Sequence, residues 1–90
     1  MIRLKVRLTE QKNNEGARKV DGEWVDCIKV SVVFIPVAND SPENKLFWDA
    51  TPEGKIEFSS VNPGVLDELV MSREYYVDIM PAEEHLNLSM

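Results

Sequence analysis

The sequence is poor in the side chains from which most enzymes build reactive sites. It contains one cysteine, one histidine and four glycines in 90 residues. Cys27 alone cannot form an intramolecular disulfide or a cysteine-based zinc site, and it fits a reducing compartment. No Cys-His or Ser-His-acid motif includes His85, and the isolated glycines form no phosphate-binding or dinucleotide-binding loop. We therefore predict no catalytic residue, no metal site and no cofactor.

Positive charge and long apolar runs are also scarce. Ten Lys and Arg residues against sixteen Asp and Glu give a net charge of -6, which opposes non-specific binding to nucleic acid or to an anionic membrane. Charged and apolar residues alternate at the start of the chain, and such alternation is not typical of a signal peptide or a membrane span. We expect a cytoplasmic protein that has no membrane partner, and nucleic acid is disfavoured as a ligand.

The apolar residues predict strands more often than helices. Ile2 to Leu8 alternates strictly between apolar and charged side chains, which indicates a half-buried strand. Trp24 to Val37 is rich in β-branched residues and should form the central strand. Two further alternating segments, 55–61 and 74–80, predict a third and a fourth strand. Residues 11–22 are polar and lack a period, so we interpret them as a mobile connection.

Two short helices are expected between the later strands. Ser41 before Pro42 is typical of a helix N-cap followed by proline at the first helical position, and it predicts a helix from Pro42 to about Ala50. Asn62 before Pro63 repeats this pattern and predicts a helical turn through Val70. The fold class is therefore α+β, with a mainly antiparallel curved sheet or small barrel of about four strands. Residues 1–83 should form one domain, and residues 84–90 a loosely ordered tail.

The segment from Ser41 to Gly54 is the most distinctive candidate for a binding site. Asn44, Lys45 and Thr51 offer donors to an anionic or purine-like group, and Trp48 offers a stacking face. The structural alternative is that Leu46 and Phe47, with or without Trp48, plug the end of a small barrel while Lys45 stays solvated. The two interpretations carry similar weight.

A second candidate site is a row of cations near the N-terminus. Arg3, Lys5 and Arg7 recur at every second residue, which places them about 7 Å apart on one strand face, a spacing that suits phosphate groups. The alternative is a solvated strand face, or an edge that its charge protects from aggregation. This alternative is favoured. Nucleic acid is a still less suitable ligand, because Leu4 and Val6 between the cations belong to the buried side and are not exposed aromatics.

Several motifs follow one another along the second half of the chain. They are the run from Ser41 to Lys45, then Phe47-Trp48, Ala50-Thr51-Pro52, Gly54 and Asn62, and finally Glu74 to Asp78 with Pro81-Ala82-Glu83. Together they resemble a widespread family of small tailed-bacteriophage proteins. The resemblance covers roughly residues 28 to 83 and contains no catalytic or cofactor signature. The resemblance implies a phage origin and a short intracellular chain.

The chain is also similar, in size, acidity and lack of catalytic residues, to viral sponge proteins that sequester cyclic-nucleotide immune signals. This similarity implies a homo-oligomer that holds its ligand between subunits through aromatics and a few cations and does not cleave it. The resulting hypothesis is a non-enzymatic anti-defence binding protein. The alternative is an interaction or assembly module that binds a phage or host protein through its sheet edge and its acidic C-terminal end.

Overall fold

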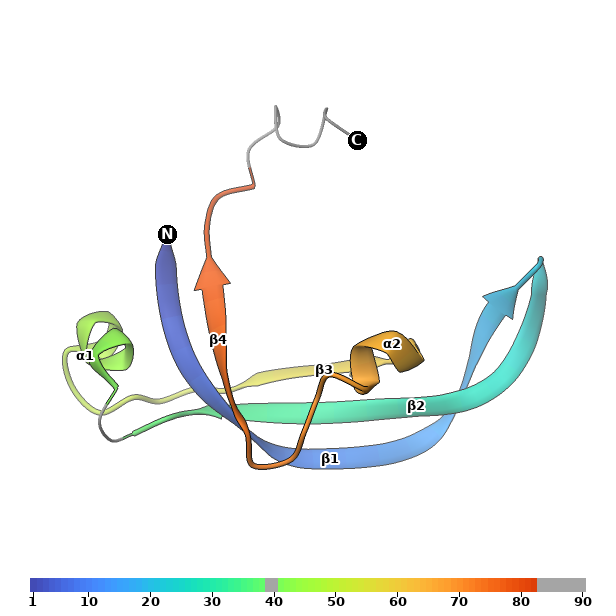
Figure 1. Cartoon of the computed structure of the whole chain (residues 1–90), viewed down its shortest axis with the longest axis horizontal. Helices are drawn as coiled ribbons and strands as arrows, with labels where there is room; N and C mark the ends of the chain where they lie inside the picture. Colours follow the sequence, from blue (N-terminus) through green and yellow to red (C-terminus); the bar gives the residue numbers. More distant parts are fainter. Residues whose placement is uncertain (39–40, 83–90) are drawn as a thin grey trace.

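The computed structural model describes residues 1–38 and 41–82. Four strands and two short helices follow one another along the chain (Figure 1). Their bounds are β1 (Ile2–Val20), β2 (Glu23–Pro36), α1 (Pro42–Trp48), β3 (Ile56–Ser60), α2 (Pro63–Leu66) and β4 (Glu74–Ile79).

The strands form one antiparallel sheet in the order β3-β2-β1-β4. A two-residue turn joins the two long inner strands, and Val20 pairs with Glu23 beside it. Asp21 and Gly22 in this turn both have positive φ angles, 51° and 83°. Two positive φ values are what a type I′ turn requires, and this turn matches the twist of the strands that it joins.

The hairpin of β1 and β2 is longer than the strands on either side of it. β4 pairs only with residues 2–7 of β1, and β3 pairs only with residues 30–34 of β2. The remaining part of the hairpin, residues 11–29, projects from the sheet and curves upward at the right of Figure 1. We call it the arm.

One face of the sheet carries the core. Its buried apolar residues come from the two inner strands and are Leu4, Val6, Leu8, Val30, Val32 and Phe34. Leu66 and Leu69, in and after α2, pack against this cluster together with Tyr75 and Val77 of β4. A β-bulge between Leu8 and Glu10 shifts the register of β1. Beyond the bulge, odd-numbered instead of even-numbered side chains of β1 lie on the core face.

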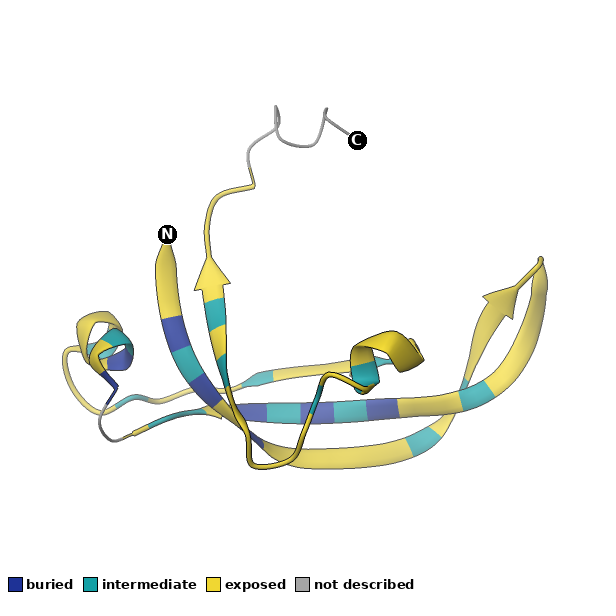
Figure 2. Cartoon of the chain, viewed as in Figure 1, coloured by how far each residue is buried: buried dark blue, intermediate teal, exposed yellow. Residues whose placement is uncertain are grey.

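The core is confined to the N-terminal part of β1 and the part of β2 beside it, and it does not extend into the arm (Figure 2). Six apolar residues are buried, whereas sixteen large apolar residues of the described chain are exposed. Exposed apolar side chains lie at both ends of the molecule, on α1 and on the arm. A chain with so small a core gains little stability from its own interior.

The structure confirms the α+β class, the antiparallel sheet and its four strands, and it corrects three details. Residues 11–22 are not a mobile connection, because most of them extend β1 along β2. The sheet is not closed into a barrel, since β3 and β4 are its two edges. The helices are also shorter than predicted: α1 ends at Trp48, where Asp49 adopts a left-handed conformation, and α2 ends at Leu66. The predicted tail, residues 84–90, lies outside the described residues.

Candidate functional site

Local sequence signals define both ends of α1, which lies beside the N-terminal half of β1. Ser41 accepts a hydrogen bond from the backbone N–H of Asn44, and Pro42 occupies the first turn. At the other end the backbone N–H of Asp49 donates to the carbonyl of Lys45. The helix thus forms as its capping residues predict.

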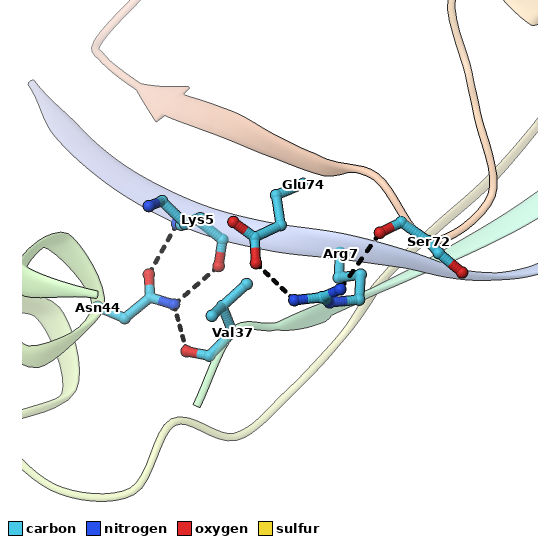
Figure 3. Close-up of polar contacts among 6 residues, drawn as sticks. All are labelled: Lys5, Arg7, Val37, Asn44, Ser72 and Glu74. Carbon is cyan, nitrogen blue, oxygen red and sulfur yellow. Dashed lines mark hydrogen bonds and ion pairs between the residues drawn. The ribbon is translucent and has the colours of Figure 1, made fainter. Parts of the chain in front are cut away.

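Asn44 occupies the place where β2 stops pairing with β1 (Figure 3). Its Oδ1 accepts a hydrogen bond from the N–H of Lys5 at 2.7 Å. Its Nδ2 donates to the carbonyls of Lys5 and Val37, both at 2.7 Å. The residue is 1% exposed. Both amide donors are therefore used inside the fold, and we assign Asn44 to fixing α1 on the sheet instead of to ligand binding.

The other three residues predicted from this segment do not converge on one site. Lys45 lines an open hollow of about 690 Å³ together with Asp49, so the hollow contains both signs of charge. Trp48 instead lines a separate cavity of about 140 Å³ with Leu4 and Val6 of the core face. Thr51 is exposed in the bend after the helix.

The indole of Trp48 is engaged within its own segment. Its Nε1 donates to the carbonyl of Glu53, and its ring meets Phe47 edge-on. Leu46 is 87% exposed and Phe47 is also exposed, so these two residues do not plug the end of the sheet. Neither of the two interpretations of this segment describes it fully: Trp48 lines a small cavity beside Leu4 and Val6, and Leu46 and Phe47 of the helix are exposed.

Arg3, Lys5 and Arg7 lie on the sheet face opposite the core, and β4 supplies acids beside the two arginines. Arg3 forms a two-pronged ion pair with Asp78, at 2.7 and 2.9 Å. Arg7 pairs with Glu74 and also donates to the carbonyl of Ser72 (Figure 3). The row is thus largely neutralised by its neighbouring strand, which weakens it as a track for phosphates.

The electrostatics of this face follow from these pairs. The hydrogen bond from Arg3 lowers the pKa of Asp78, and the same bond raises the pKa of Arg3. Glu43 of α1 also has a lowered pKa, because its own backbone N–H and then the Ser41 hydroxyl bond to the carboxylate. Lys5 lies 5.5 Å from the centre of the Tyr76 ring and has no acidic partner among residues 1–38 and 41–82.

Two exposed side chains of the arm were not among the predicted site residues. Trp24 is 70% exposed and Ile28 is 60% exposed. By register both lie on the face that carries Val30, Val32 and Phe34. Lys19 pairs with Trp24 across the ladder, and its ammonium lies 5.6 Å from the indole ring. The Asp21-Gly22 pair was the sequence signal for this hairpin.

The described part of the chain contains neither a cluster of potential metal ligands nor a membrane-spanning helix. No three His, Cys, Asp or Glu side chains of these residues lie close enough together to bind a metal ion. No helix within them has the length and apolar character needed to cross a bilayer. His85 and the acidic residues Glu83 and Glu84 lie outside the described residues.

Comparison with known proteins adds no relative from which a function can be taken. The chain matches no family model, and neither a curated protein nor a solved structure is significantly similar to it.

Proposed function

We propose that this chain is a phage-encoded, non-enzymatic interaction module that binds another protein through its arm. The observation that carries the proposal is the exposure of Trp24 and Ile28 on a ribbon that extends beyond the sheet. Tryptophan is enriched among residues that dominate protein interfaces, because one rigid side chain buries a large apolar area.

The arm has features of a docking element and not of a structural one. Residues 11–29 contribute none of the six buried apolar residues of the described chain. A two-stranded ribbon without a covering layer is marginally stable in water. Contact with a partner would bury Trp24 and Ile28 and would thereby stabilise the ribbon.

The proposal is tested by capture from a lysate of phage-infected host cells with matched variants. Trp24→Ser combined with Ile28→Ser removes both apolar anchors. Leu46→Ser removes an even more exposed apolar side chain from α1, at the other end of the sheet. We expect the wild type and the Leu46 variant to retain the same protein, and the arm variant to lose it. Equal capture by all three would contradict the proposal.

Sequestration of a cyclic-nucleotide signal is the second candidate, and the cations around Ala38 favour it. The hollow that Lys45 lines and a second hollow of about 540 Å³, lined by Lys5 and Arg7, share Ala38. Cations on two neighbouring hollows suit a ligand with two phosphate groups. Asp49 and Glu74 line the same hollows, and their carboxylates would repel phosphate groups. We therefore rank this candidate second.

A thermal-shift panel separates the second candidate from the first. Sequestration predicts that a cyclic dinucleotide or a cyclic ADP-ribose isomer raises the melting temperature and is recovered intact after denaturation. Lys5→Ala and Lys45→Ala should abolish the shift, whereas Lys12→Ala, outside both hollows, should preserve it. The absence of any shift across the panel would remove this candidate.

A further inference from the structure

The outer edge of β1 is open along the arm. β4 pairs with β1 only up to Arg7, and the carbonyl and N–H of Leu8 are then bonded by Ser72 and Arg73. From Gln11 to Lys19 no described strand pairs with this edge. An open edge of this length is a ready template for another strand.

The turn fixes which backbone groups face outward. The pair that closes a two-residue hairpin, here Val20 and Glu23, is hydrogen-bonded. Because successive residues of a strand direct their N–H and C=O groups to opposite sides, the even-numbered residues from Lys12 to Val20 bond to β2. The odd-numbered residues from Gln11 to Lys19 therefore present unpaired N–H and C=O groups at the edge.

The charged side chains on this edge complement those of a second copy of the chain that runs antiparallel to it. Glu15 and Lys19 both point to the core face of the ribbon and lie symmetrically on either side of Ala17. In an antiparallel pair centred on Ala17, Glu15 of each chain lies directly opposite Lys19 of the other. Opposite charges in this position stabilise a strand pair, and like charges destabilise it.

Neighbouring registers are less favourable. In an antiparallel pair, a residue whose N–H and C=O face outward must lie opposite another residue of this kind. The registers that satisfy this rule are those in which the two-fold axis passes through a residue of β1. An axis at Glu15 sets two Glu15 carboxylates together and places Lys12 opposite Arg18. An axis at Gly16 brings neither like nor opposite charges face to face, and an axis at Asn14 places Val20 against Leu8, whose backbone is already bonded.

We propose that two copies of this chain pair antiparallel along the outer edges of their β1 strands, in the register centred on Ala17. Three residue pairs, Glu15 with Lys19, Ala17 with Ala17 and Lys19 with Glu15, exchange six backbone hydrogen bonds and form two ion pairs. A lone lysine on an edge usually blocks pairing; here Glu15 supplies its complement. The sheet then continues through both chains, and Trp24 and Ile28 remain open on the same face.

This inference rests on the proposed function because it names a second copy as one partner of the arm. Proline variants test the edge pairing by sedimentation equilibrium. Ala17→Pro removes only an outward N–H, which a strand edge tolerates, and we expect it to be monomeric. The matched control Asp26→Pro removes an outward N–H from β2 on the opposite edge and should leave the dimer intact.

Charge reversal tests the register. Glu15→Lys and Lys19→Glu should each weaken the dimer at least about tenfold, and the double variant, which exchanges the two charges, should return to within about threefold of the wild type. A monomeric wild type at a concentration of several hundred micromolar, or a dimer that survives Ala17→Pro, would overturn the inference. A dimer that the double variant does not restore would overturn the register. Either result leaves capture of another protein through Trp24 and Ile28 unaffected, so the two failures are distinguishable.

Discussion

Asn44 illustrates how one polar side chain can serve the fold where its type suggests ligand binding. Its amide takes over from the backbone of β2 at the point where that strand ends, and it bonds two carbonyls and one N–H. The sequence predicts the helix cap at Ser41, because that signal is local. It does not predict the contact of Asn44 with Lys5, because 39 residues separate them.

Replacing Asn44 with alanine should therefore lower the free energy of unfolding by about 2 kcal/mol, since buried backbone groups lose their partners. Lys45→Ala, one residue further along the helix, should change it by less than about 0.5 kcal/mol. Urea denaturation followed by circular dichroism measures both. An Asn44 variant as stable as the wild type would contradict the structural role of the amide.

The ion pair between Arg3 and Asp78 gives the stability a dependence on pH. Arg3 lowers the pKa of Asp78 below its ordinary value of 3.8. A carboxyl whose pKa is depressed by folding contributes stability above its unfolded pKa and loses it as the pH falls through the folded value. The stability advantage of the wild type over Asp78→Asn should thus be constant near neutral pH and shrink below about pH 4. Thermal unfolding over this range checks the trend, and a growing advantage on acidification would contradict it.

Among the elements, the strands that face a covered core and the β2 half of the arm were predictable, and the β1 half of the arm was not. Ile2 to Leu8 alternates because one of its faces meets the core, so its sequence has a period of two. Among residues 11–20 only Asn14 and Gly16 are partly buried and the rest are exposed, so no apolar face is required there and the sequence has no period of two. The bulge after Leu8 also shifts which residues share a face, which breaks the alternation at the same place.

Gly16 provides a test of how the arm is joined to the sheet. A Cβ atom at this position would lie 2.8 Å from Cβ of Lys29 and 3.3 Å from Cγ1 of Val61. Gly16→Ala should therefore destabilise the protein by about 1 to 2 kcal/mol. Without this contact, the same change would stabilise it by restricting the unfolded chain.

The sign of the change is thus decisive and can be read from the denaturant midpoint. Ala17→Ser, at the next and exposed position, is the control and should be nearly neutral. A stabilising Gly16→Ala would show that the strands approach each other less closely at this point than the structure has them.

For the molecule as a whole, the balance between buried and exposed apolar residues favours a binding partner. Among the described residues, six buried apolar side chains form the core, while Trp24, Ile28, Leu46 and others are exposed to water. The general α+β class followed from the sequence because strand periodicity and helix caps are local. The open sheet and the projecting arm did not, because they depend on how the two long strands pair over their full length.

Native mass spectrometry of the protein isolated from its host shows whether the chain binds whole protein chains. We expect assemblies in which the 10.3 kDa chain is accompanied by whole protein chains, either a second copy or another protein. Ala17→Pro should remove the second copy, and Trp24→Ser combined with Ile28→Ser should remove the other protein. A bare monomer, or a monomer that carries only a mass of nucleotide size, would contradict this expectation.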